Sequence, residues 1–170
     1  MSFVFLPDLI LPALTDLTPE LLHKRGICWL FLDFDNTIVP YTTDQPTEQM
    51  DAWLRQMLCS DIRLCVVSNS RKPRVPAFCE QYQIDYVLRA AKPFQRGIRK
   101  ALTRYDAAPQ QAALVGDQIY TDVLGANCAG LTSVLVSAIH NHTVWLKLRH
   151  AAELPFIALG RRRIARRPAE

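Results

Sequence analysis

The stretch Leu30-Phe31-Leu32-Asp33-Phe34-Asp35-Asn36-Thr37 joins an apolar run to two carboxylates that stand one residue apart. The apolar run begins at Ile27, and a continuous run of this length is typical of a strand covered on both faces of a parallel sheet. An unpaired carboxylate is costly to bury, so two of them at the end of a buried strand indicate a metal site or a reaction.

Apolar strands and amphipathic helices alternate along the rest of the chain. The patterns predict strands near residues 62–67, 86–89, 112–115 and 131–136, and helices near residues 47–59, 73–82, 93–105, 120–128 and 143–154. A short helix is also expected after Thr18-Pro19-Glu20, and it should end at Gly26. The alternation predicts one α/β domain built on a doubly wound, mostly parallel sheet.

The same patterns assign particular apolar residues to the core. Leu58 is expected on the inward face of the helix at 47–59, and Phe94 on that of the helix at 93–105, where Pro93 would occupy the first turn. Residues 3–17 contain prolines at positions 7 and 12. This segment is expected to be irregular or briefly helical, and core packing is favoured over membrane contact for its apolar side chains.

Length and charge bound the organisation of the chain. It has 170 residues, of which 49% are hydrophobic, and this suits one domain with a substantial core. We expect residues 1–150 to form that domain with an N-terminal lead-in, and residues 151–170 to form a basic tail that is partly disordered or faces a membrane. Five arginines and Glu170 in the last ten positions account for the whole formal charge of +4.

Cysteine usage and hydropathy indicate the compartment. The five cysteines form no C-x-x-C pair, and we expect them to be reduced core residues in a cytosolic-type compartment. The N-terminus lacks the basic region of a secretory signal. Because no apolar run reaches the roughly 20 residues that cross a bilayer, a cytoplasmic location is expected, with any membrane contact peripheral.

Polar residues follow four of the predicted strands, at or just after the point where each strand ends. They are Asp33 with Asp35, Ser68 with Asn69, Lys92, and Asp117. Taken singly, each could be a turn residue, a helix cap or a solvated surface charge. In open α/β sheets, however, ligands bind beyond the carboxyl ends of the strands. The joint placement therefore predicts one shared crevice.

These residue types suit phosphoryl chemistry. Three carboxylates provide the oxygen ligands that Mg²⁺ prefers. The Ser68 hydroxyl, backbone N–H groups and the Lys92 ammonium suit phosphoryl oxygens, whose transfer requires positioning and charge neutralisation. A carboxylate in the same crevice can act as the nucleophile, so phosphoryl transfer through an aspartyl phosphate is the natural inference.

The four clusters resemble the four motifs of the haloacid dehalogenase (HAD) superfamily, in the same order. The matching segments are Asp33-Phe34-Asp35-Asn36-Thr37, Val66-Val67-Ser68-Asn69, Lys92-Pro93 and Gly116-Asp117-Gln118-Ile119-Tyr120-Thr121-Asp122. The resemblance is closest to the YqeG-like branch of subclass IIIA, which includes the mitochondrial and plant-type phosphatidylglycerophosphate phosphatases, and it covers roughly residues 5–150. It implies a Rossmann-like HAD fold.

The resemblance also implies a role for each site residue. Asp33 would be the nucleophile, and Asp35 the general acid and base, with its backbone carbonyl on Mg²⁺. Thr37 would support the loop geometry. Phosphate binding is assigned to Asp33, Phe34, Asp35, Ser68, Asn69 and Lys92. Metal binding is assigned to Asp33, Asp35 and Asp117, with Asp122 behind them as a second-shell or water-mediated ligand.

The spacing between the motifs limits the substrate. Only 30 residues separate Thr37 from Ser68, and 22 separate Asn69 from Lys92, and each interval must already hold a helix and a strand. A capless enzyme with an open crevice is therefore expected. The resemblance associates such enzymes with substrates presented on a lipid membrane, a protein or a nucleic acid, since small soluble phosphates usually need a cap that excludes water.

The arginine-rich end indicates what kind of partner the chain could bind. Such a cluster can attract an anionic membrane or nucleic acid phosphates, or can simply be a solubilising disordered end. We expect peripheral contact with the inner face of a membrane, through the N-terminal apolar stretch and the tail, in preference to nucleic acid.

The function expected from the sequence is Mg²⁺-dependent hydrolysis of phosphatidylglycerophosphate to phosphatidylglycerol and phosphate. Two alternatives remain open. One is a capless HAD phosphatase for a phosphoprotein or a nucleic-acid end, and the other is a non-catalytic module that binds ribosomes or nucleic acid.

Overall fold

Six parallel strands form one sheet in the computed structural model, which describes residues 4–139 and 144–165, with the backbone alone for 144–151. The strand order is β1-β6-β5-β2-β3-β4. The strands are β1 (Leu9–Leu11), β2 (Trp29–Leu32), β3 (Arg63–Val67), β4 (Asp85–Val87), β5 (Ala112–Gly116) and β6 (Thr132–Val136). The prediction of an α/β domain on a parallel sheet is confirmed.

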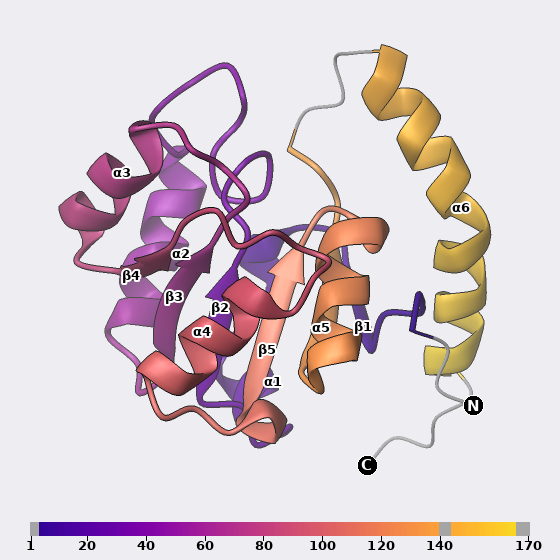
Figure 1. Ribbon diagram of the computed structural model, residues 1–170, viewed down its shortest axis with the longest axis horizontal. Helices are drawn as coiled ribbons and strands as arrows, with labels where there is room; N and C mark the ends of the chain where they lie inside the picture. Colours follow the sequence, from indigo (N-terminus) through magenta and orange to yellow (C-terminus); the bar gives the residue numbers. More distant parts are fainter. Residues whose placement is uncertain (1–3, 140–143, 166–170) are drawn as a thin grey trace.

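Helices cover both faces of this sheet (Figure 1). They are α1 (Pro19–His23), α2 (Glu48–Leu58), α3 (Arg74–Tyr82), α4 (Arg96–Arg104), α5 (Leu124–Ala129) and α6 (Val144–Ala165), with 3₁₀ turns η1 (Leu14–Asp16) and η2 (Pro109–Gln111) and a π-helical turn η3 (Ile119–Val123). Leu30 and Leu32 of β2 share a core with α1, α2 and α3, whereas Phe31 faces α4 and α5. This alternation along β2 makes the sheet doubly wound.

Local sequence explains α2 and its one misplaced core residue. The Thr47 hydroxyl caps the helix by accepting a hydrogen bond from the Met50 N–H (3.2 Å). Trp53 is buried, and its indole N–H donates to the Leu17 carbonyl (2.7 Å). Leu58 was expected in the core but is 40% exposed, because it ends the helix at the edge of the buried stripe.

The N-terminal segment, expected to be irregular or briefly helical, contains the brief helical turn η1 but also a strand that was not expected. Residues 9–11 form β1, an edge strand paired with β6 in the register Leu9↔Val134. Leu9, Leu14 and Leu17 are buried, so these side chains pack in the core as favoured. The strand is only three residues long, and the prolines at 7 and 12 that bracket it hide the signal; proline is tolerated at such an edge.

The segment before α4 also differs from its prediction. The Lys92–Pro93 peptide is cis, and the helix begins only at Arg96. Phe94 was expected in the core but is 74% exposed. The Asn69 side chain explains the difference, because it accepts from the Lys92 N–H (2.7 Å) and donates to the Lys92 carbonyl (2.9 Å). Residues 93–95 therefore form a turn that positions Lys92 rather than a first helical turn.

The predicted helix at 143–154 is present, but it continues through Pro155 to Ala165 as α6. The boundary expected after residue 150 thus falls inside one helix. Gly160 lets α6 approach β1 closely, since a Cβ atom there would lie 3.1 Å from Pro7 Cδ and 3.3 Å from Ile10 Cδ1. None of the helices in the described part of the chain has the length and apolarity to span a membrane.

Two further expectations concern the cap and the cysteines. The connection from β2 to β3 contains one helix, α2, and that from β3 to β4 contains only α3, so no cap domain interrupts either connection in these described residues. All five cysteines are free. Cys65 and Cys79 are buried as expected, whereas Cys59 and Cys128 are exposed.

Candidate active site

The four polar clusters converge at the carboxyl ends of the central strands. β2 lies between β5 and β3, so Asp33 stands between the residues that follow those two strands. The Asp33 N–H donates to the Val115 carbonyl (2.9 Å), so the hydrogen bonds between β2 and β5 continue as far as Asp33. Asp33, Ser68, Lys92 and Asp117 are each at most 6% exposed. The sheet edge therefore holds a buried polar cluster, as the sequence predicted.

Lys92 is the cation of this cluster. Its ammonium lies 2.6 Å from Asp33 Oδ1 and 2.7 Å from Asp122 Oδ1. Burial alone would lower the pKa of Lys92, but the Asp122 and Asp33 carboxylates outweigh burial and raise the pKa above its ordinary value. The side chain is consequently protonated and holds Asp33 in place.

Two carboxylates of this cluster, Asp33 and Asp122, pair with Lys92, and Asp117 lies beside them. One oxygen from each of Asp33, Asp117 and Asp122 lies within 4.8 Å of the other two. Burial raises the pKa of Asp122 to about 6, Lys92 opposes this rise and Asp33 adds to it. The excess of buried negative charge, carried entirely by oxygen donors, fits a hard divalent cation such as Mg²⁺.

Asp122 belongs to the same buried cluster as Asp33 and Lys92. Beyond its ion pair with Lys92, its Oδ2 accepts from the Gln118 N–H (3.2 Å), which fixes it within the turn η3. Gly116 makes room for it, since a Cβ atom at position 116 would overlap the Asp122 carboxylate. Asp122 is thus packed directly into the cluster.

Asp35 stands apart from the three clustered carboxylates. Burial raises its pKa, the Arg74 guanidinium 3.3 Å away acts to lower it, and Asp33 raises it further; the net direction is upward. The backbone is fixed locally, because the Asn36 N–H donates to the Val39 carbonyl (2.8 Å) with Asn36 in the left-handed region. A carboxyl that retains its proton more readily than usual suits a general acid.

Arg74 is a site residue that the sequence did not reveal. It is the first residue of α3, and its side chain is only 10% exposed. Its guanidinium donates to the Pro40 carbonyl (2.9 Å) and the Thr43 carbonyl (2.9 Å) and lies over the Phe34 ring (5.1 Å). The arginine therefore holds the loop 40–44 against Asp35. A buried arginine has no local sequence signal that distinguishes it from a surface arginine.

The remaining predicted residues occupy supporting positions. The Ser68 hydroxyl accepts from the Ser70 N–H (3.0 Å) at the end of β3. The Phe34 side chain is buried against Phe78 (5.2 Å between ring centroids), so the phosphate role predicted for Phe34 would fall to its backbone. Thr37 is 1% exposed, and its hydroxyl has no hydrogen-bond partner among the described residues.

Glu153 of α6 is a second residue that sequence reasoning missed. It is 2% exposed, and its carboxylate accepts from the Ile119 N–H (3.0 Å). Next to it, the Tyr120 hydroxyl donates to the Ala152 carbonyl (3.2 Å). These bonds attach α6 to η3, the turn that carries Asp122.

Known proteins share this arrangement of sequence and fold. Residues 89–152 match the family model described as HAD-hydrolase-like. The Bacillus subtilis protein described as "Probable phosphatase YqeG" is 32% identical over 132 residues, which are 78% of this chain and 77% of the relative.

Solved structures resemble the fold at low sequence identity. A cobalt-bound deoxy-D-mannose-octulosonate 8-phosphate phosphatase from Haemophilus influenzae has a TM-score of 0.53 at 13% identity, covering 80% of this chain and 92% of that one. A protein described as a HAD superfamily (subfamily III A) hydrolase from Legionella pneumophila has a TM-score of 0.52 at 16% identity, covering 76% and 74%.

The parallel sheet, the strand-end carboxylates and the extended similarity to YqeG agree with one another. The chain belongs to the HAD superfamily of hydrolases and is a phosphatase of the YqeG-like kind.

Proposed function

We propose that this phosphatase is a Mg²⁺-dependent phosphomonoester hydrolase that converts phosphatidylglycerophosphate to phosphatidylglycerol and phosphate. One observation carries the chemical part of the proposal. Asp33 is held by Lys92 at 2.6 Å, beside Asp117 and Asp122, while Asp35 stands apart with a raised pKa. One carboxylate is thus paired with an ammonium that positions it for attack, and another is suited to carry a proton.

In the first step, the Asp33 carboxylate attacks the phosphorus atom and displaces the leaving oxygen. Asp35 donates its proton to that oxygen as the P–O bond breaks. Lys92, the Ser68 hydroxyl and the Asn69 N–H hold the phosphoryl oxygens. The products of this step are an aspartyl phosphate, which is an acyl phosphate, on Asp33 and the free alcohol.

In the second step, the Asp35 carboxylate accepts a proton from water, and the water oxygen attacks the phosphorus atom. The bond to Asp33 breaks, which releases inorganic phosphate and restores both carboxyl groups to their starting states. Mg²⁺ bound by Asp33, Asp117 and the Asp35 carbonyl, with Asp122 beside them, would neutralise charge on the phosphoryl oxygens.

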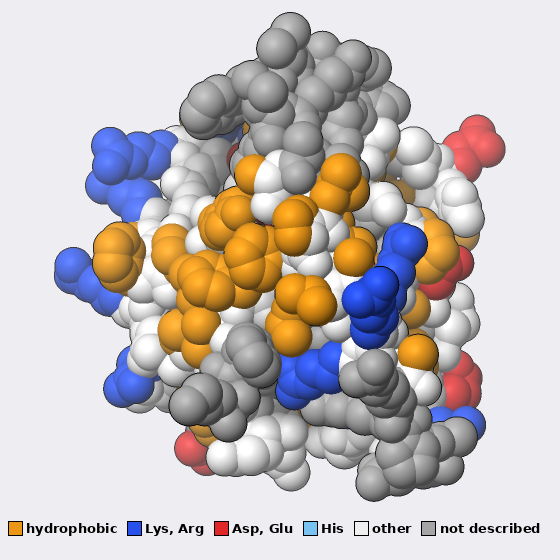
Figure 2. Space-filling model, turned by 90° about the vertical axis from the view of Figure 1, so that its right-hand side faces the viewer, with side chains coloured by type: hydrophobic (Ala, Val, Ile, Leu, Met, Phe, Trp, Pro, Cys, Tyr) orange, Lys and Arg blue, Asp and Glu red, His pale blue; other side chains and the backbone are white. Residues whose placement is uncertain are grey.

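The surface of α6 supports a lipid substrate. Figure 2 shows hydrophobic side chains gathered on the face of the molecule that carries this helix, with Lys and Arg side chains next to them. Leu154 is 51% exposed and Leu159 is 50% exposed, although Ile157 on the same helix packs inward. A helix with apolar residues on both sides suits the boundary between protein and membrane. Because Leu6, Leu9 and Leu14 are buried, we assign the peripheral membrane contact to α6.

Phosphate release from competing substrates tests the proposal. The full chain is incubated with vesicles containing phosphatidylglycerophosphate, with a phosphopeptide and with a 5′-phosphorylated oligonucleotide, each with Mg²⁺ or with EDTA. We expect Mg²⁺-dependent release from the vesicles to be at least about tenfold faster than from the other two. Faster release from the peptide or the oligonucleotide would contradict the lipid assignment.

A nucleophile variant separates enzyme from binding module. The Asp33→Asn protein should release no phosphate from any of these substrates. Full function of that variant in cells would favour a non-catalytic role.

A further inference from the structure

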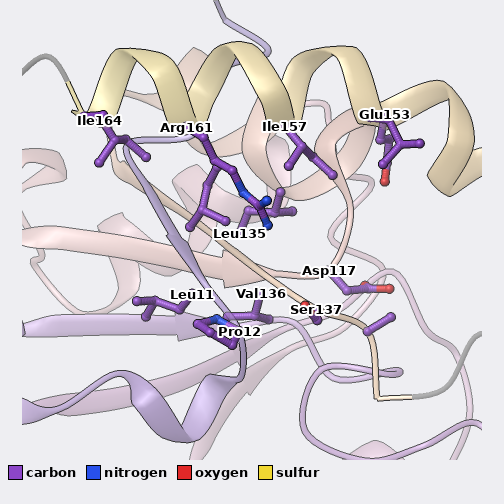
Figure 3. A pocket seen from close by; sticks show the side chains of 14 residues that line it. Leu11, Pro12, Asp117, Leu135, Val136, Ser137, Glu153, Ile157, Arg161 and Ile164 are labelled. Carbon is purple, nitrogen blue, oxygen red and sulfur yellow. The ribbon is translucent and has the colours of Figure 1, made fainter.

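A groove of about 610 Å³ lies beneath α6 and begins at the catalytic edge of the sheet. Asp117 stands at one end of it, and the carboxyl ends of β1 and β6 form its floor (Figure 3). The lining is mostly aliphatic and includes Leu11, Leu135, Val136, Ile157 and Ile164. A volume of this size is typical of sites that hold a small organic ligand.

Among the described residues that line the groove, Arg161 has the one cationic side chain. Figure 3 shows Arg161 extending from α6 into the space above Leu135, between Ile157 and Ile164. Within residues 4–139 and 144–165, no carboxylate forms an ion pair with this guanidinium. A guanidinium without a carboxylate partner in aliphatic surroundings is complementary to an anionic group that bears an alkyl chain.

The order of residues along α6 gives the groove a direction. Glu153 is bound at η3 close to Asp117, and residue 161 lies about 12 Å further along the helix axis at a rise of about 1.5 Å per residue. An Arg161 side chain extended into the groove can therefore meet an anion that is linked through a short polar spacer to a phosphate at Asp33. Ile164 and Leu11 lie beyond it, where an alkyl chain would follow.

We propose that this groove binds the lipid part of the substrate: Arg161 binds the phosphodiester, and one acyl chain lies along Ile164 and Leu11. The inference rests on the proposed phosphatidylglycerophosphate activity. It adds a subsite that selects a phosphomonoester attached to a second anionic group and an alkyl chain. Substrates without those two features would make no contact with the groove.

Two groove variants and two matched controls test the inference. Arg161→Gln removes the cation, and Ile164→Trp fills the groove; Arg25→Gln and Leu58→Trp make the same chemical changes at exposed positions outside it. The kcat/KM of each full-length protein is measured with Mg²⁺ on dipalmitoyl and dibutyryl phosphatidylglycerophosphate and on p-nitrophenyl phosphate.

Each variant has a distinct expected pattern. Ile164→Trp should lower kcat/KM about tenfold for the dipalmitoyl lipid alone. Arg161→Gln should lower it about tenfold for both lipids, since it loses a charge-assisted hydrogen bond, and neither variant should change p-nitrophenyl phosphate hydrolysis. Equal effects of Ile164→Trp on both chain lengths, or a wild-type rate with Arg161→Gln on both lipids, would overturn the inference while leaving the proposed activity intact.

A binding measurement separates the two proposals if the wild-type chain hydrolyses p-nitrophenyl phosphate but neither lipid. That result would defeat the proposed substrate. Saturable binding of monomeric palmitoyl lysophosphatidylglycerol to the wild type, abolished by Ile164→Trp, would still support the groove as a lipid site. Absence of saturable binding would overturn it, as would a wild-type dimer that Ile164→Trp converts to a monomer, because a second copy would then occupy the groove.

Discussion

The two sides of the catalytic crevice are built from opposite kinds of contact. On the side of α3, Arg74 binds backbone carbonyls of the loop 40–44 and lies 3.3 Å from Asp35, so that side is fixed by charge and hydrogen bonds. On the side of α6, aliphatic residues line an open groove around Arg161. In the function that we propose, the fixed side serves chemistry common to all phosphomonoesters, whereas the aliphatic side distinguishes one substrate from another.

The largest effect is expected where the two sides meet. Asp33→Asn should lower turnover of every substrate by about 10⁴-fold or more, because it removes the nucleophile that we propose. The fold should persist, since Lys92 keeps its ion pair with Asp122 (2.7 Å). Turnover of p-nitrophenyl phosphate and circular dichroism check both statements. Asp61→Asn, at an exposed residue that pairs with His23, is the control and should retain full activity.

Removing the contacts of Arg74, on the α3 side of the crevice, should affect all substrates alike. Arg74→Met should lower kcat by about 10²-fold, because Asp35 and the loop 40–44 lose their common partner. The pH profile should also move. Burial and Asp33 both raise the pKa of Asp35 and Arg74 opposes them, so removing Arg74 raises that pKa further. More alkaline solution is then needed to ionise Asp35 for water activation, which shifts the acid limb to higher pH.

The kcat of Arg74→Met measured across pH on p-nitrophenyl phosphate and on both lipids checks this prediction. Arg25→Gln provides the matched loss of an exposed arginine. An unshifted acid limb of the pH profile would contradict the effect of Arg74 on Asp35. A loss of kcat confined to the long-chain lipid would contradict a role of the α3 side that is common to all substrates.

Displacing α6, on the aliphatic side of the crevice, should affect the hydrolysis of lipids selectively. Gly160→Val places a branched side chain where even a Cβ atom would lie 3.1 Å from Pro7 Cδ, so α6 must move away from β1. We expect a loss of about 1–3 kcal/mol in the free energy of unfolding and a weaker preference for dipalmitoyl over dibutyryl lipid. Urea unfolding and the two kcat/KM values measure these effects. Ala152→Val, at an exposed position of the same helix, should change neither.

The smallest effect is expected away from both sides. Asp51 belongs to α2. Hydrogen bonds from Arg55 and from Tyr82 lower its pKa. A carboxyl with a lowered folded-state pKa stabilises the protein above its unfolded pKa of about 4, and the stabilisation is lost as pH falls through the folded value. Asp51→Asn should therefore lower Tm slightly near pH 7, and the difference should be smaller at about pH 3.

Thermal unfolding at both pH values measures this difference, with Glu48→Gln on the same helix as control. A difference that is as large in acid would mean that Asp51 acts by packing rather than by charge. Catalysis should be unaffected by either variant, because neither residue lies on either side of the crevice.

Sequence patterns revealed the central part of this site because its signals are local. Asp33, Ser68 and Asp117 each end an apolar strand, and parallel strands bring such ends together at one edge. Arg74 and Glu153 left no such signal, since the groups that they bind, around residues 35–44 and at Ile119, lie about 30 or more residues away in the sequence. Contacts between segments that are distant in sequence depend on the assembled fold.

The elements of the fold also differ in whether a local sequence signal predicts them. The buried strands and α2 follow from apolar periodicity and a threonine cap. The edge strand β1 is too short to show a period, and α6 passes through Pro155, which predicts a helix end. Phe94 was misplaced because hydrogen bonds between Asn69 and Lys92 determine the chain path before α4.

Gly116 has a consequence for how this sequence can vary. The Asp122 carboxylate occupies the volume that any side chain at position 116 would need, while the same carboxylate pairs with Lys92. The residues at positions 116 and 122 are therefore expected to change together. A descendant sequence that keeps the ion pair must keep the glycine, and one that acquires a side chain at 116 must rebuild the cation's surroundings at the same time.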